Sequence, residues 1–161
     1  MKLDISRIVG LEGLCNSGKS HVLKALCKIL LALPNSRLLY VRQPNGEICS
    51  DSSRIDYRND ICAWIAVGGK NICIISGGDY VSLGKTIVDI TVQVNIHIEV
   101  LFVAMRFLYP AVGEAFRKDI SEYGLKVKSI FKPGCKRVDH FPDGVLDWVD
   151  SIWVDLLMKE L

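Results

Sequence analysis

The chain has 161 residues, of which 50% are hydrophobic, and this length suits one domain with a well-buried core but is too short for two large domains. We therefore expect a single domain over residues 1–161. The formal net charge is only +2 and the basic residues are scattered among acidic ones, so the composition gives no electrostatic basis for binding nucleic acid or a membrane surface.

The first predicted elements are a buried strand near residues 7–11 and a helix over residues 19–33. The helix shows apolar residues at helical spacing and ends at Pro34. Between strand and helix the chain reads Gly13-Leu14-Cys15-Asn16-Ser17-Gly18-Lys19-Ser20, which satisfies the pattern G-x-x-x-x-G-K-[ST]. A strand, a glycine-rich loop and a helix in this order predict a loop that binds a triphosphate.

Each fixed residue type in this loop has a physical role. The glycines allow a tight turn that aims backbone N–H groups at a phosphate, at the positive end of the helix dipole. Lys19 would add a full positive charge against the β- and γ-phosphates, and the hydroxyl of Ser20 would ligate Mg²⁺. The predicted nucleotide contacts are Gly13, Cys15, Asn16, Ser17, Gly18, Lys19, Ser20 and the adjacent His21.

The middle of the chain is predicted to form a hairpin. A strand over residues 37–42 is followed by a polar, turn-rich and mobile segment over residues 43–59. Two apolar runs, residues 61–67 and 70–76, are joined by Gly68-Gly69, the two-residue signal for a β-hairpin. The charged segment before the hairpin is either a substrate-binding or switch segment or an exposed loop; it holds Asp51, Arg54, Asp56, Tyr57, Arg58 and Asp60.

The rest of the chain alternates helices with strands. We predict a helix over residues 83–94, a strand over residues 97–105, a helix over residues 111–123 and a strand over residues 125–131. A C-terminal helix follows over residues 145–157. Its apolar stripe is expected to pack onto the sheet, with a partner surface as the alternative; the stripe comprises Val145, Trp148, Val149, Ile152, Trp153 and Leu156.

Cysteine usage indicates a reducing compartment. No Cys-x-x-Cys pair is present, and the cysteines lie within or beside apolar runs, which favours buried thiols over a disulfide or zinc framework. The first seven residues lack the apolar core of a secretory signal, and the most apolar window, residues 87–105, contains several charged and polar residues. We therefore expect a cytoplasmic protein without a membrane partner. The cysteines are Cys15, Cys27, Cys49, Cys62, Cys73 and Cys135.

The start of the chain resembles the P-loop NTPase superfamily. The matching residues are Ile8-Val9-Gly10-Leu11-Glu12-Gly13 and Ser17-Gly18-Lys19-Ser20, which look most like small nucleoside and nucleotide kinases. The resemblance extends to the end of the first helix. It implies a three-layer α/β fold, with a mostly parallel sheet that includes the β-hairpin, helices on both faces, and a ligand beyond the carboxyl ends of the strands.

P-loop proteins that hydrolyse or transfer phosphate normally hold Mg²⁺ or its water with a carboxylate at the end of an apolar strand. Here the apolar run over residues 71–75 ends in Ser76. Asp79, which follows Gly77 and Gly78, is the nearest candidate for a metal ligand or catalytic group. The two glycines would let this turn approach the γ-phosphate, with Gly78 as a nucleotide contact. A simple surface turn is the alternative.

Other residues indicate how the reaction could be catalysed and which nucleotide could bind. Nucleotide kinases close an arginine-bearing lid over the phosphates, and Arg106 is a candidate catalytic arginine of this kind, with Arg117 and Lys118 nearby. Glu12, beside the loop, is an alternative base or substrate contact. No Asn-Lys-x-Asp follows the strand over residues 97–105, so guanine recognition by the device of small GTPases is not expected, and ATP is the predicted nucleotide.

The sequence thus predicts a P-loop nucleotide-binding domain that binds ATP with Mg²⁺ and hydrolyses it slowly. Lys19, Asp79 and Arg106 are the predicted catalytic residues, and Ser20 and Asp79 the predicted metal ligands. One alternative is a kinase for a small molecule or a nucleotide. The other is a non-catalytic nucleotide-binding regulatory or interaction module, which the missing strand-end carboxylate favours. The second substrate or protein partner stays open.

Overall fold

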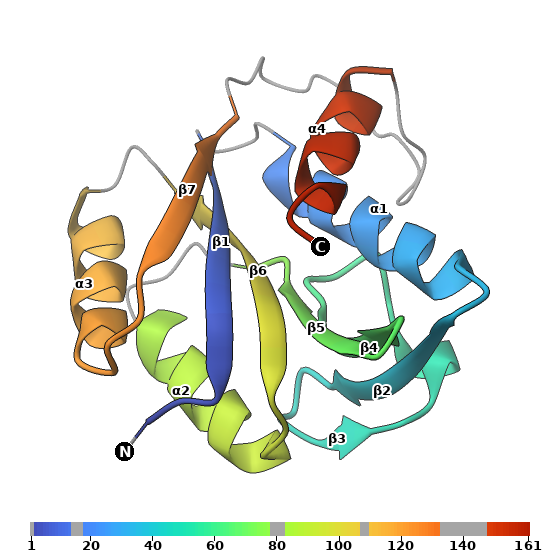
Figure 1. The fold of residues 1–161 in the computed structure, drawn as a ribbon, viewed down its shortest axis with the longest axis horizontal. Coiled ribbons are helices and arrows are strands. Elements are labelled where there is room, and N and C mark those ends of the chain that lie inside the picture. Colours follow the sequence, from blue (N-terminus) through green and yellow to red (C-terminus); the bar gives the residue numbers. More distant parts are fainter. Residues whose placement is uncertain (1, 14–17, 78–82, 107–109, 133–147) are drawn as a thin grey trace.

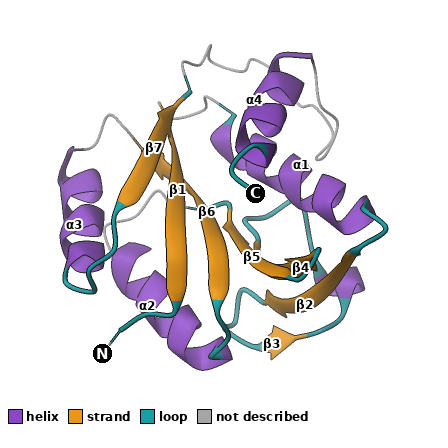
Figure 2. Cartoon of the chain, in the orientation of Figure 1, coloured by secondary structure: helices purple, strands orange, loops and turns teal. Residues whose placement is uncertain are grey.

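A seven-stranded mixed β-sheet forms the centre of the fold (Figure 1). The computed structural model describes residues 2–13, 18–77, 83–106, 110–132 and 148–161. The strands, orange in Figure 2, are β1 (Ile5–Gly13), β2 (Ser36–Arg42), β3 (Ile48–Cys49), β4 (Cys62–Val67), β5 (Lys70–Ile75), β6 (Ile98–Arg106) and β7 (Val127–Phe131). The helices are α1 (Lys19–Ala32), α2 (Leu83–Val94), α3 (Pro110–Ser121) and α4 (Trp148–Met158), with a 3-10 helix at Ser52–Arg54. Within these ranges no helix is both long and apolar enough to span a membrane.

The strand order brings several chain segments to one edge of the sheet. The order is β3-β2-β4-β5-β6-β1-β7, with β1 parallel to both of its neighbours and β5 parallel to β6. Strand β4 runs antiparallel to both β5 and β2. The carboxyl ends of β1, β2, β5, β6 and β7 and the amino end of β4 therefore lie at the same edge, which we call the carboxyl edge.

Two hydrophobic clusters hold the helices on the sheet. Helices α1 and α4 cover one face, and α2 and α3 cover the other (Figure 1). Strand β6 contributes to both clusters because successive side chains of a strand point to opposite faces. Val100 and Phe102 pack with α1, whereas Leu101 and Val103 pack with α2. The predicted α/β class with helices on both faces is confirmed, and the sheet is mixed because β3 and β4 run against the other strands.

The predicted hairpin is confirmed. Strands β4 and β5 pair antiparallel with Val67 opposite Lys70, so Gly68 and Gly69 alone form the connection. Both glycines have positive φ angles, 55° and 81°, which is the backbone that a two-residue type I′ turn requires and that glycine adopts most readily. This short turn fixes the register of the whole hairpin.

The sequence located most of the other elements, and the helix over residues 83–94 followed from the crossover that parallel strands need. The helix predicted over residues 83–94 is α2, with the same bounds, and strands or helices also stand at the other predicted places. One addition lies in the segment over residues 43–59, where Ile48 and Cys49 form β3 beside the end of β2. The chain turns back at Gly46, whose φ is 88°. Part of this segment is therefore a short hairpin rather than a loop.

The C-terminal helix buries a different face from the predicted one. In α4, Val154 and Leu157 are buried in the cluster with α1, whereas Ile152 and Leu156 are 54% and 37% exposed. The expected stripe was therefore wrong at Ile152 and Leu156, and residues 145–147 lie outside the described residues. Because the helix is apolar on most sides, periodicity alone cannot choose between stripes that differ by one residue. Packing against α1 makes the choice.

Truncating the buried face of α4 should cost more stability than truncating its exposed face. We expect Leu157→Ala to lower the free energy of unfolding by about 2–5 kcal/mol, because it leaves a cavity in the core. Leu156→Ala, the matched control one residue away, should cost about 1 kcal/mol or less. Urea denaturation of both variants and the parent measures the difference. Equal losses would contradict this packing, and a larger loss for Leu156→Ala would mean that the helix packs through the stripe predicted from the sequence.

Candidate functional site

The glycine-rich segment lies at the carboxyl edge, between the end of β1 and the start of α1. Residues 14–17 lie outside the described residues. Gly18 stands at the N-cap of α1 with a φ of 85° and a ψ of 15°, a left-handed backbone that glycine adopts without strain. Its carbonyl accepts a hydrogen bond from the N–H of Val22 at 3.0 Å. A helix N-terminus, which favours anions, therefore begins where the predicted phosphate loop ends.

The Lys19 side chain reaches back from α1 to the end of β1. The residue is only 5% exposed, and its Nζ donates a hydrogen bond to the carbonyl of Gly13 at 3.1 Å. Gly13 is both the last residue of β1 and the first glycine of the motif, so the ammonium group joins the two ends of the loop. A charge held in such a buried place attracts an anion more strongly than one in water does. Lys19 and the positive end of α1 thus act on the same small volume.

Ser20 connects the first turn of α1 to the end of β5. Its hydroxyl donates a hydrogen bond to the carbonyl of Ser76 at 2.9 Å, and Ser76 directly follows β5. Strand β6 lies between β1 and β5 in the sheet, so this hydrogen bond reaches across the end of one strand. The oxygen of Ser20 keeps lone pairs with which it can ligate a cation.

Ser76 is the polar centre of this edge. It is wholly buried. Its Oγ accepts a hydrogen bond from the N–H of Ile61 at 2.8 Å and donates one to Oδ1 of Asp60 at 3.2 Å. Its own N–H donates to the carbonyl of Ile61 at 3.0 Å. Ser76 therefore joins α1, the residues before β4 and the end of β5 in one hydrogen-bond network.

Asp60 places a carboxylate at the end of β5, where the sequence has none. Because β4 is antiparallel to β5, its amino end meets the carboxyl end of β5. Sequence reasoning named Asp60 only as part of a charged segment with two interpretations. A signal was available, however: the register that the Gly68-Gly69 turn sets, continued beyond the hairpin, puts Asp60 opposite Gly77. Asp60 is exposed, so its carboxylate is open to a ligand.

Gly77 allows Asp60 to approach this closely. A Cβ atom built on Gly77 would lie 2.7 Å from Oδ2 and 2.9 Å from Cγ of Asp60, which is closer than side-chain atoms pack. Asp60 could then keep its hydrogen bond to Ser76 only if the backbone moved. The glycines after β5 were expected to permit a close approach of this turn to a phosphate, and at Gly77 the group that approaches is a carboxylate of the same chain.

Glu12, an alternative base in the sequence interpretation, is engaged by neighbouring side chains. The residue is 5% exposed, and its Oε1 accepts a hydrogen bond from the hydroxyl of Ser129 at 2.8 Å and another from the guanidinium of Arg117. These contacts join β1 to β7 and α3. The arrangement favours a structural role for Glu12, and it shows that Arg117 forms an ion pair rather than standing alone as a solvated charge.

The structure brings part of the predicted site together. Arg106 is the last residue of β6 and pairs in register with Gly13, so its backbone lies beside the end of β1. His21 lies in the first turn of α1. The predicted residues that meet at the carboxyl edge are Gly13, Gly18, Lys19, Ser20, His21 and the backbone of Arg106. Those that lie outside the described residues are Cys15, Asn16, Ser17, Gly78 and Asp79.

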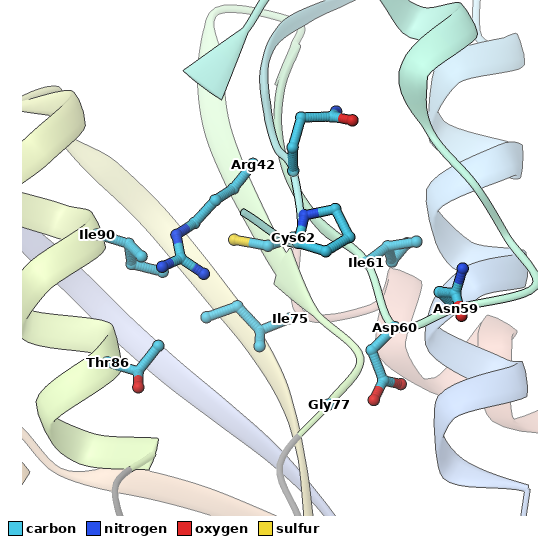
Figure 3. Close-up of a pocket in the computed structure, with 11 residues that line it drawn as sticks. Arg42, Asn59, Asp60, Ile61, Cys62, Ile75, Gly77, Thr86 and Ile90 are labelled. Carbon is cyan, nitrogen blue, oxygen red and sulfur yellow. The ribbon is translucent and has the colours of Figure 1, made fainter. Parts of the chain in front are cut away.

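A cavity of about 290 Å³ opens beside Asp60 (Figure 3). Its walls come from the end of β2, the start of β4, the end of β5 and one side of α2. Arg42, the last residue of β2, projects into it, and Nε of this side chain is buried without a hydrogen-bond partner among the described residues. Sequence reasoning did not single out Arg42. Only its place at the carboxyl edge of the sheet, which needs the strand order, could have done so.

The described cysteines are free thiols. Cys27, Cys49, Cys62 and Cys73 are free, and burial raises the pKa of the Cys27 thiol to about 11. Such a thiol is protonated and unreactive at neutral pH. Among the described residues, no group of three or more His, Cys, Asp or Glu side chains is arranged to hold a metal ion.

Comparisons of the chain with protein-family models, curated proteins and solved structures give no match. The resemblance to P-loop NTPases therefore stays a prediction that rests on the motif over residues 13–20. The geometry of the carboxyl edge is the independent observation that bears on this prediction.

Removing the hydroxyl of Ser76 should destabilise the protein. We expect Ser76→Ala to lower the free energy of unfolding by about 1–3 kcal/mol, because the N–H of Ile61 loses its acceptor in a buried place. Ser50→Ala, at an exposed serine, should change it by about 0.5 kcal/mol or less. Urea denaturation measures both changes. A Ser76→Ala variant as stable as the parent would show that this network does not hold the carboxyl edge together.

Proposed function

We propose that this chain is a P-loop NTPase that binds ATP with Mg²⁺ at the carboxyl edge and hydrolyses it slowly. The observation that carries the proposal is the position of Lys19. Its buried ammonium group bonds to Gly13 across the glycine-rich segment, at the N-terminus of α1. A phosphate group there would meet a full positive charge, a helix dipole and backbone N–H donors at once.

Mg²⁺ binding follows from the chemistry of Ser20 and its surroundings. Mg²⁺ prefers oxygen ligands and keeps several of its waters when it binds with substrate phosphates. The hydroxyl of Ser20 would supply one oxygen and the phosphates others. In this proposal Asp60, which is linked to Ser20 through Ser76, accepts hydrogen bonds from water beside the metal.

Hydrolysis needs a water aimed at the γ-phosphorus. Most of the catalysis in phosphoryl transfer comes from positioning and from charge stabilisation by the metal and by cationic side chains. We assign the positioning of the water to Asp60, since its carboxylate is exposed and is held at the end of β5 by Ser76. Asp79 was the candidate for this role from the sequence, so the two carboxylates are separate hypotheses that variants can distinguish.

Loss of Lys19 should abolish most nucleotide affinity, whereas loss of Asp60 should affect turnover. By isothermal titration with Mg²⁺ and ATP, we expect Lys19→Ala to weaken binding at least about tenfold, because it removes a buried charge–phosphate contact. Asp60→Asn should leave the affinity within about twofold and lower the rate of phosphate release about 10²-fold, the usual range for a lost acid–base group. Lys126→Ala and Asp155→Asn, at exposed positions away from the carboxyl edge, are the matched controls.

The same assay separates the remaining hypotheses. A parent protein without ATP affinity would overturn the proposal. A parent that binds ATP without turning it over would instead be the non-catalytic module. If Asp79→Asn rather than Asp60→Asn loses turnover, the reaction is catalysed from the turn after β5. Parallel measurements with GTP test the preference for adenine that the missing Asn-Lys-x-Asp implies.

A further inference from the structure

The cavity beside Asp60 adjoins the proposed nucleotide site. Asp60 and Gly77 both line it, and Ser76, the residue before Gly77, accepts the hydrogen bond from Ser20. Asp60 is therefore linked by two hydrogen bonds, through Ser76, to Ser20, the residue to which we assign Mg²⁺. The cavity and the phosphate loop share the carboxyl edge, but they take their residues from different strands.

The cavity contains a cationic group that has no partner in the part of the chain that the structure describes. Nε of Arg42 is buried and unbonded, and within the described ranges Arg42 forms no ion pair. The Arg42 side chain is half-buried: Nε is covered by protein, whereas the two terminal nitrogens are not buried in this way. Covering a guanidinium without an acceptor is costly, and a planar oxyanion can bind its accessible N–H donors in pairs. Figure 3 shows the Arg42 side chain directed toward Thr86 and Ile90 of α2. An oxyanion at this end of the cavity would also meet the hydroxyl of Thr86.

The rest of the cavity suits a small carbon skeleton with a hydroxyl group. Ile75 and Ile90 form apolar walls, and Asp60 stands on the side away from α2 (Figure 3). The volume of about 290 Å³ is at the lower limit for small-molecule sites. An adjoining hollow of about 260 Å³ also includes Arg42 and Asp60. The size excludes a folded polymer and fits a compact metabolite.

We propose that this cavity binds a small hydroxylated acid, with its oxyanion at Arg42 and a hydroxyl at Asp60, and that this acid accepts the γ-phosphoryl group of ATP. The inference rests on the proposed nucleotide site and makes the protein a small-molecule kinase. The hydroxyl oxygen forms a bond to the γ-phosphorus and gives its proton to the Asp60 carboxylate. The bond from that phosphorus to the oxygen shared with the β-phosphate breaks, and its electron pair leaves on ADP.

Binding at Arg42 can be measured without nucleotide. In ¹⁵N-labelled protein the Nε–H resonance of Arg42, assigned by its loss in Arg42→Lys, should shift when gluconate or glucose 6-phosphate is added. Glucose, which has the hydroxyl groups but no oxyanion, should leave it in place. Gluconate and glucose 6-phosphate distinguish a carboxylate from a phosphate as the preferred oxyanion. Lys19→Ala should bind the acids as the parent does, because Lys19 does not line the cavity.

Transfer is measured by ADP release from Mg²⁺-ATP in the presence of the same three compounds, with glycerate and glycerol 3-phosphate as smaller acids. At least one acid should raise the rate tenfold or more above hydrolysis in water, with its phosphate ester as product, and glucose should not. Arg42→Gln should lose this stimulation and Arg42→Lys should regain part of it. Arg37→Gln, at an exposed arginine on the opposite end of β2, should keep it in full.

The two proposals fail in different ways. If the acids shift the Arg42 resonance but ATP does not bind, the nucleotide assignment is wrong and the acid site stands. If ATP binds and is hydrolysed but none of the four acids shifts the resonance or accelerates ADP release, the acceptor site is overturned. Stimulation that survives in Arg42→Gln overturns it as well.

Discussion

Ser76 is the residue on which the whole carboxyl edge depends. A polar side chain buried this completely must have its hydrogen bonds satisfied, and Ser76 finds its partners in two separate parts of the chain. Its carbonyl takes the hydroxyl of Ser20, and its own hydroxyl lies between Ile61 and Asp60. These bonds form together only when α1, β5 and the residues before β4 are in place. The position of Asp60 is therefore a consequence of folding.

The strand order explains why this network has to span some distance. Strand β6 separates β1 from β5, so the glycine-rich segment and the end of β5 are not neighbours in the sheet. Ser20 bridges the gap from the first turn of α1. The antiparallel direction of β4 then brings a carboxylate to the end of β5 from the preceding segment, which a parallel strand in the same position could not do. Ser76 thus stands at the strand end where P-loop proteins normally carry a carboxylate, and its hydroxyl donates a hydrogen bond to the carboxylate of Asp60.

Features that depend on a few neighbouring residues were predicted correctly from the sequence. The Gly68-Gly69 turn requires two positive φ angles, so the hairpin and its register follow from two residues. The face of α4 does not follow in this way, because the helix is apolar on most sides and only its packing against α1 buries Leu157 in place of Leu156. The two-residue strand β3 likewise forms because it pairs with the end of β2, and two residues are too few to show a strand pattern in the sequence.

The candidate site also has one part that depends on neighbouring residues and one part that depends on strand pairing. The motif over residues 13–20 is contiguous, so the prediction of phosphate binding could be made from the chain alone. Asp60 and Arg42 are separated in sequence, and they line one cavity because β2 and β4 run antiparallel. The sequence placed Asp60 in a charged loop and Arg42 only at the end of a strand. Sites made by strand pairing become visible once register and strand order are known.

Arg42 bears on the choice between a hydrolase and a transferase. Hydrolysis requires one oriented water, for which a carboxylate at the position of Asp60 is sufficient. A cavity of about 290 Å³ with a buried, unbonded guanidinium nitrogen adds nothing to that reaction, and leaving such a group without a partner reduces stability. In the proposed transferase, an acid in the cavity would give the Arg42 guanidinium an acceptor and would place a hydroxyl where the water would otherwise stand. The Asp60 carboxylate would then serve a different nucleophile, and the contact between Arg42 and the oxyanion would determine which acid binds.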